Sequence, residues 1–280
     1  PLRMLVGWYV VTTTVVPPLS LLNSRRMYLK LLKAFDDMEK SKTDGDAESR
    51  FLDESELDLF ITTTDIAGVP LQIRLSDSVV FERRHRNVFH FKYAPKETLD
   101  DDADDGGAPD ANQTTEGRND FVSKNNPFLA FAARCTSSFP FAFEPMRLAD
   151  IDEVLDTFPQ YRANGDFRGA SEAWRRFFNR NVIGTIGKDI VDRPFGDGGY
   201  LDNKPFSFAV DTISRREAEI PVDRKLIYIE PSPEHPEDDV ESDQKPDAIE
   251  NVMSALLTLP RYETIREDLE RVQDRNRLID

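Results

Sequence analysis

Short β-branched runs, separated by amphipathic helical segments, constrain the fold of this chain more than any other feature. Residues 57–64 (LDLFITTT) form a short apolar run rich in β-branched side chains, which is typical of a buried strand. Apolar residues alternate with polar ones over 71–75 and again over 89–93, which predicts two further strands nearer a sheet edge. Residues 226–229 (LIYI) are a fourth candidate, again as a buried strand.

Apolar side chains recur at helical spacing in the segments between these runs. The spacing predicts helices over 24–38 and 126–136, the second opened by Pro127 in its first turn. Two more helices are expected over 249–257 and 265–272, on either side of Pro260. Helices alternating with strands indicate an α/β layer architecture, and we expect residues 1–280 to form a single domain.

Charge and composition exclude several classes of protein. The formal net charge is −16, which argues against binding to a nucleic-acid backbone. A single cysteine excludes a disulfide framework, and three scattered histidines do not predict a metal site. The acidic segment 96–118 cannot bury enough apolar surface to order itself, so it is interpreted as a flexible insertion rather than a calcium loop. The acidic, proline-rich segment 231–245 is expected to be a second mobile loop.

The uncharged segment 4–23 allows a secretory or membrane-spanning interpretation. Its β-branched residues and the pair Pro17-Pro18 favour a buried strand or loop instead, because proline breaks a spanning helix. The segment also lacks the basic start and cleavage pattern of a signal peptide. Cytoplasm is therefore the default compartment, and contact with a membrane surface stays compatible with it.

Asp197, flanked by glycines, is the most informative candidate for chemistry. Glycine adopts backbone conformations closed to other residues, so Gly196, Gly198 and Gly199 can hold the aspartate at a sharp turn. A general base needs such a rigid presentation within reach of its proton donor. Taken alone the signal is weak, because Asp-Gly is also a common turn dipeptide.

The context of Asp197 resembles that of a known enzyme family. Residues 195–205 (FGDGGYLDNKP) resemble the Asp-Gly-Gly block of patatin-like phospholipases, and residues 132–145 (AARCTSSFPFAFEP) are similar to the small-residue segment upstream of that block. The run 57–65 looks like the strand before that segment, and 259–265 (LPRYETI) resembles the end of a bacterial-type subgroup. The likeness is collinear over most of the chain.

This resemblance implies a lipid acyl hydrolase that uses a Ser–Asp dyad. It implies a three-layer α/β fold with a mainly parallel central sheet flanked by helices. Asp197 would be the catalytic base, supported by its loop glycines, and would take the proton of a serine without a histidine. The substrate would be a phospholipid or another acyl lipid, with no cofactor, no metal and no nucleic acid.

One essential part of the family pattern is missing from the sequence. There is no Gly-x-Ser-x-Gly nucleophile elbow and no glycine-rich oxyanion loop. Since the chain begins at Pro1, one explanation is an N-terminally incomplete protein whose nucleophile lies upstream. The alternative is a pseudoenzyme, a lipid-binding or interaction module that keeps the fold without catalysis. In either case the 280 residues alone are expected to be inactive.

Other polar residues favour structural roles. Ser137 and Ser138 lack the strand–turn–helix context of a nucleophile and are expected to pack or to line a pocket. Cys135 is expected to be a small buried apolar residue. His85 lies in a basic cluster, which fits anionic lipid headgroups or a solvated edge that discourages sheet pairing. His90 is expected to be an ordinary surface or edge residue.

Overall fold

The computed structural model describes residues 19–40, 56–75, 78–94, 117–155, 190–216, 222–229, 247–255 and 266–279. Most of the two acidic segments and residues 4–18 of the uncharged segment 4–23 lie outside these ranges. Among the described helices, none is long and apolar enough to cross a membrane.

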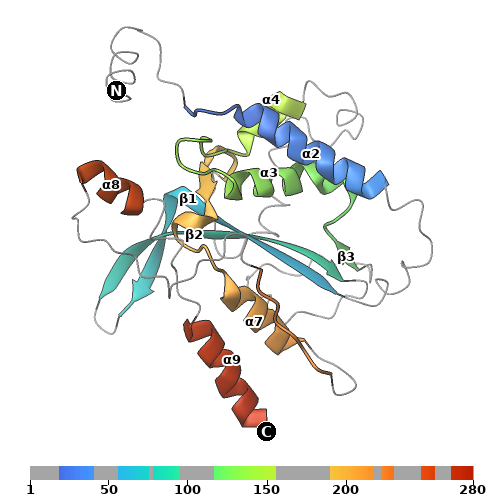
Figure 1. Ribbon diagram of the computed structural model, residues 1–280, viewed down its shortest axis with the longest axis vertical. Coiled ribbons are helices and arrows are strands. Elements are labelled where there is room, and N and C mark those ends of the chain that lie inside the picture. Colours follow the sequence, from blue (N-terminus) through green and yellow to red (C-terminus); the bar gives the residue numbers. More distant parts are fainter. Residues whose placement is uncertain are drawn as a thin grey trace.

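A four-stranded antiparallel sheet lies at the centre of the described structure (Figure 1). Its strands are β1 (Leu57–Arg74), β2 (Val79–Ala94), β3 (Arg118–Asn119) and β4 (Phe195–Asp197), in the order β3-β2-β1-β4. Every neighbouring pair runs antiparallel. The expectation of a mainly parallel sheet is therefore wrong: β1 and β2 are joined by a short connection, which can link only strands of opposite direction.

Two of the predicted strands belong to one long strand. The runs 57–64 and 71–75 are both in β1, which continues through a register shift between Thr64 and Val69. The alternating run 89–93 lies in β2, its long partner in this hairpin. The run 226–229 is not a strand, because Ile227 and Ile229 are 79% and 81% exposed and the segment has no regular structure. Its residue types favour a strand, but no other strand in the described structure pairs with this segment.

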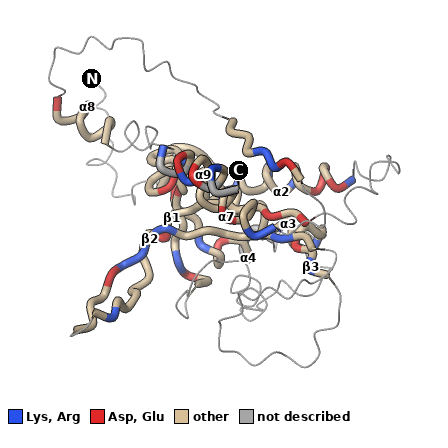
Figure 2. Tube along the Cα trace, turned by 90° about the horizontal axis from the view of Figure 1, so that it is seen from below, with Lys and Arg blue, Asp and Glu red and all other residues tan. Residues whose placement is uncertain are grey.

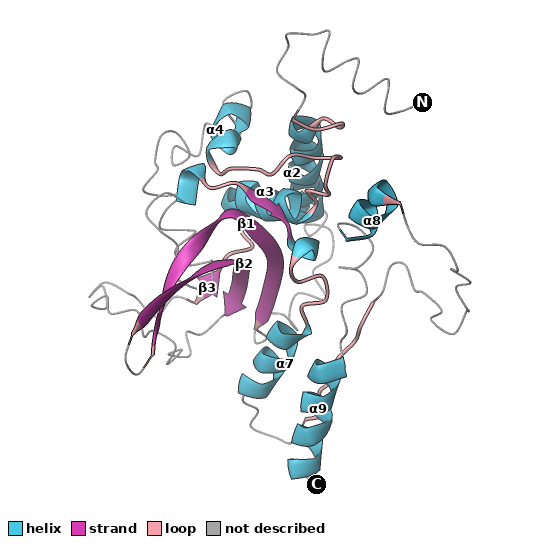
Figure 3. Cartoon of the chain, turned by 90° about the vertical axis from the view of Figure 1, so that its left-hand side faces the viewer, coloured by secondary structure: helices cyan, strands magenta, loops and turns pink. Residues whose placement is uncertain are grey.

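Helices lie on both sides of the sheet, so the predicted combination of helices with a sheet is confirmed (Figures 1 and 3). On one side are α2 (Ser24–Lys40), α3 (Asn126–Thr136) and α4 (Ala149–Leu155). On the other are α7 (Phe206–Arg215) and α9 (Arg266–Ile279), while α8 (Ala248–Met253) lies to one side. The predicted helices at 24–38 and 126–136 are confirmed as α2 and α3, and α8 and α9 begin within one residue of the predicted C-terminal pair.

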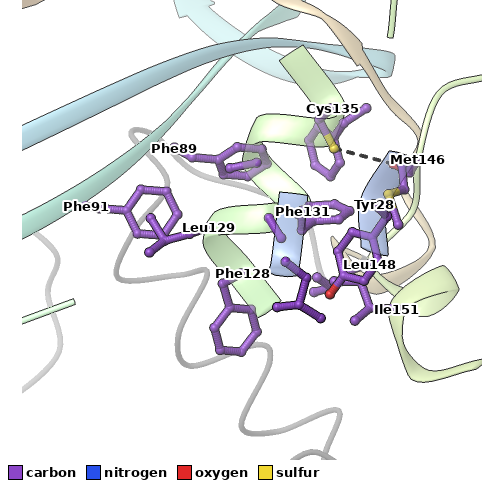
Figure 4. Close-up of a cluster of buried hydrophobic side chains, with 14 of the residues drawn as sticks. Tyr28, Phe89, Phe91, Phe128, Leu129, Phe131, Cys135, Met146, Leu148 and Ile151 are labelled. Atoms are coloured by element: carbon purple, nitrogen blue, oxygen red, sulfur yellow. Dashed lines mark hydrogen bonds between the residues drawn. The ribbon is translucent and has the colours of Figure 1, made fainter. Parts of the chain in front are cut away.

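The hydrophobic core lies between the sheet and α2 and α3 (Figure 4). Phe89 of β2, Phe131 of α3 and Phe195 of β4 contact one another, with ring centroids 5.3 to 6.1 Å apart. Cys135 is fully buried among them, as expected for a small apolar residue, and burial raises the pKa of its thiol. This core anchors β4, the strand that carries Asp197.

Candidate functional site

Asp197 is the last residue of β4, at the edge of the described sheet. It pairs with Thr63 of β1, which in turn pairs with Asn87 of β2, so the three side chains form a row on one face. Phe195, two residues earlier, shares that face and packs toward α3. The row is therefore a polar continuation of the core, in which Asn87 Nδ2 donates a 2.8 Å hydrogen bond to Thr63 Oγ1.

The carboxylate of Asp197 is half-buried and is held from one side. Its Oδ1 accepts a 2.8 Å hydrogen bond from the Gly199 amide and so caps the short 3₁₀ turn Gly198–Tyr200. Burial raises the pKa of the carboxyl group, and the Gly199 hydrogen bond opposes the rise only in part. No basic residue in the described ranges forms an ion pair with Asp197. Its basicity is therefore increased by desolvation without a compensating cation.

The three glycines provide space rather than unusual backbone angles. None of them has a positive φ, so the expectation that they adopt conformations closed to other residues is wrong. A Cβ on Gly198 would lie 2.6 Å from the carbonyl carbon of Thr62, and one on Gly199 would lie 2.9 Å from Asn203 Oδ1. On Gly196 the nearest atom would be a side-chain carbon of Ile66, 3.1 Å away. The turn can therefore lie directly against β1 only because residue 198 has no side chain.

Hydroxyl groups near Asp197 are occupied by structural hydrogen bonds. Thr64 Oγ1 donates to the Asp197 carbonyl at 2.7 Å, and Thr62 Oγ1 donates to the Asp202 carbonyl at 3.3 Å. Tyr200 donates its phenol to the Ser138 carbonyl at 2.9 Å. Burial raises the pKa of Tyr200, and the negative charge of Asp197 raises it further. These contacts attach the turn to β1 and to the end of α3.

Ser137 and Ser138 make local contacts at the end of α3. Ser137 Oγ donates to the Ala133 carbonyl at 2.7 Å. Ser138 is fully buried; its hydroxyl accepts a 2.8 Å hydrogen bond from Arg134 and donates to the Arg134 carbonyl. Both hydroxyls therefore serve the helix terminus, in line with the packing role expected for them.

A second carboxylate near the site was missed by the sequence reasoning. Asp65, at the register shift of β1, accepts hydrogen bonds from the amides of Ala67 and Gly68, each at 3.0 Å. Arg193 Nε donates to the same carboxylate at 2.7 Å and completes a buried ion pair. The signal available in the sequence was the Asp-x-x-Gly turn, since an aspartate often bonds to amides two and three residues on.

The opposite face of the sheet carries another polar cluster, beneath α7. His90 Nε2 lies 2.7 Å from Asp58 Oδ1, and Arg216 donates to the other oxygen of Asp58. The His90 ring stacks on Phe60, with centroids 4.3 Å apart, and Phe60 stacks on Phe208 of α7. The expectation of an ordinary surface histidine is wrong, because the adjacent helix covers this part of β2.

No group of three or more His, Cys, Asp or Glu side chains in the described part of the chain is arranged to hold a metal ion. Comparison of the chain with protein-family models, with curated proteins and with solved structures finds no match. The patatin-like assignment of Asp197 therefore stays a prediction from the sequence.

Proposed function

We propose that Asp197 is the general base of a lipid acyl hydrolase of the Ser–Asp type. The observation that carries the proposal is the state of its carboxylate: half-buried, with a raised pKa, fixed by the Gly199 amide and without a cationic partner among the described residues. A salt-bridged structural aspartate has a lowered pKa and is a poor proton acceptor. Asp197 has the opposite properties, which a base acting near neutral pH requires.

In this proposal the turn positions Asp197 for one step. The hydrogen bond from Gly199 fixes one carboxylate oxygen, and the other accepts the proton of a serine hydroxyl as that oxygen attacks the ester carbonyl. The proton then passes to the departing alcohol. The sequence contains no nucleophile elbow, and the hydroxyls of Thr62 and Thr64 already donate to backbone carbonyls, so the proposal takes the serine from polypeptide outside this sequence.

Asp197→Asn tests the assignment of the base. The chain is expressed together with any coding sequence found upstream of residue 1 in its gene, and hydrolysis of a short-chain p-nitrophenyl ester is measured. We expect kcat to fall by at least about 10²-fold, the lower end of what general-base catalysis contributes. Asp202→Asn, in the same turn, is the matched control and should keep its activity. Undiminished hydrolysis by a folded Asp197→Asn protein would refute the role.

The occupied hydroxyls also favour a second candidate, a non-catalytic lipid-binding module with the same fold. In that case Asp197 acts only as the cap of the Gly198–Tyr200 turn. Failure of the extended protein to hydrolyse any acyl ester, together with retained binding to lipid vesicles, would favour this candidate over the hydrolase.

A further inference from the structure

The register of β4 on β1 decides on which face of the sheet Asp197 lies. β4 is a short strand, and it pairs with Thr63, Thr64 and Asp65 of β1. A slip of one residue along β1 would turn the side chains of β4 to the opposite face. Asp197 would then leave the face that it shares with Phe195 and the core. Its place in the candidate site therefore depends on the contacts that fix this register.

The register shift of β1 lies directly beside β4. Pairing with β2 shifts between Thr64 and Val69, and beyond this point the two strands extend away from the body of the protein as a ribbon (Figure 2). Gly68 in the shift has a φ of 67°, and a Cβ there would lie 2.6 Å from a ring carbon of His85. His85 Nδ1 also lies 2.8 Å from the Asp65 carbonyl. Such irregularities often lie beside active sites, where they redirect a side chain.

Asp65 presents a fixed carboxylate at this shift. Its Oδ1 accepts hydrogen bonds from the amides of Ala67 and Gly68, each at 3.0 Å, and its side chain is only 3% exposed. The other oxygen, Oδ2, accepts the 2.7 Å hydrogen bond from Arg193 Nε. Because two backbone amides of β1 hold the carboxylate, it cannot follow Arg193 if β4 moves.

Arg193, two residues before β4, binds two points on β1 at once. While its Nε donates to the Asp65 carboxylate, its Nη2 donates to the Gly68 carbonyl at 2.7 Å. The guanidinium group is planar and rigid, so it reaches both acceptors in one arrangement. A slip of one residue would displace it by about 3.3 Å, which breaks both hydrogen bonds. The side chain is 14% exposed, so water replaces these contacts poorly.

The other contacts of β4 select its register less specifically. Phe195 and Met146 exchange two backbone hydrogen bonds of 2.9 Å, but backbone groups are the same at every residue. Gly196 has no side chain that could select a partner. Packing of the Phe195 ring in the core favours the observed face. Arg193 adds the polar contact that only this register allows.

We propose that Arg193 is a positioning residue, which fixes the register of β4 against Asp65 and so holds the Asp197 carboxylate in its place. The value of this contact for catalysis rests on the proposed function, whereas the register itself does not. Two alternatives exist: the ion pair only adds stability, or Arg193 acts on Asp197 through its charge. The three explanations differ in the effect that they predict on the pKa of Asp197.

Titration of the Asp197 carboxyl group by carbon NMR separates them in the full chain, with Asp197→Asn used to assign the signal. Burial raises the pKa of Asp197, so Arg193→Met, which loosens β4, should lower this pKa toward that of an exposed aspartate. Loss of a nearby positive charge would instead raise the pKa. A contact that only adds stability would leave the pKa unchanged. Either of the last two results would overturn the proposal.

Two further variants make the test independent of charge and of folding. Asp65→Asn removes the same contact with the opposite change of charge; positioning predicts a lower pKa of Asp197 here too, whereas a charge effect predicts opposite signs for the two variants. Combining Asp65→Asn with Arg193→Met should lower the pKa no further. Arg193→Lys keeps the charge but reaches only one acceptor, and it replaces Arg193→Met if that variant does not fold. An unchanged pKa of Asp197 in Arg193→Lys would then overturn the proposal.

Arg118→Met is the matched control. Arg118 forms a comparable ion pair, with its Nη2 2.7 Å from Asp120 Oδ2, at the opposite edge of the sheet. This variant should leave the pKa of Asp197 unchanged. An equal fall would show that any destabilised variant exposes Asp197, and would overturn the proposal.

Activity gives a second readout in the extended protein. Arg193→Met should lower kcat about 10²-fold, the loss that a misplacement of about 1 Å can cause. An unchanged kcat in a protein whose hydrolysis requires Asp197 would overturn the positioning role. If Asp197→Asn leaves hydrolysis undiminished, the proposed function fails, and the NMR titration still decides whether Arg193 positions β4.

Discussion

Replacing Gly198 with alanine tests the close approach that shapes the candidate site. The added methyl group would overlap the backbone carbonyl of Thr62, at a separation below the 3.0 Å that real Cβ atoms maintain. A backbone carbonyl cannot rotate away as a side chain can, so the turn has to move from β1. This movement strains the hydrogen bond from Thr64 Oγ1 to the Asp197 carbonyl.

The expected cost follows from these contacts. Overpacking of this kind costs about 2 kcal/mol, and a weakened hydrogen bond adds about 1 kcal/mol. Alanine also reduces the entropy of the unfolded chain, which offsets the loss by about 0.7 kcal/mol. The free energy of unfolding should therefore fall by about 2 kcal/mol, which corresponds to a decrease in Tm of about 4–8 °C.

Gly199→Ala is the matched control, one residue along the same turn. Its Cβ would meet only side-chain oxygens, those of Asn203 at 2.9 Å and Asp197 at 3.2 Å, which shift more easily than a backbone carbonyl, so we expect the free energy of unfolding to fall by less than about 1 kcal/mol. Urea unfolding followed by circular dichroism measures both variants. Equal stability of the two proteins would show that the turn does not lie against Thr62 as described.

Two further predictions concern the buried charges. Burial favours the neutral form of Asp58, but the hydrogen bonds from His90 and Arg216 prevail and lower its pKa. The contribution of Asp58 to stability is therefore present at neutral pH and is lost as the pH falls below about 4. Asp58→Asn should flatten the acid side of a curve of unfolding free energy against pH. An unchanged acid side would contradict the contacts of Asp58 with His90 and Arg216. Arg134→Met should lower the free energy of unfolding, measured in urea, by about 3 kcal/mol. The reason is that Arg134 is fully buried and donates hydrogen bonds to the Ser138 hydroxyl and the Glu144 carbonyl. Arg26→Met, on the surface of α2, is the control and should have no measurable effect.

The residues of the candidate site were found from local sequence, but their physical roles were not. Asp197 and its glycines form a short contiguous motif, which a reader of the sequence can see. The reason that Gly198 must be glycine is the carbonyl of Thr62, in a distant part of the chain. The raised pKa of Asp197 likewise depends on the surrounding fold, since burial is its cause. Asp65 and Arg193, 128 positions apart, have no joint signature in the sequence.

The same division holds for the fold. The periodicity of apolar residues was enough to predict α2 and α3, because a helix buries one face at a spacing that adjacent residues reveal. It also located most of β1 and β2. The expected parallel direction came from the family resemblance, whereas alternation of apolar and polar residues, as over 71–75 and 89–93, is itself more typical of antiparallel sheets. The exposed run 226–229 shows a second limit of sequence patterns. Its residue types favour a strand, but a strand forms only where the fold places a partner strand beside it.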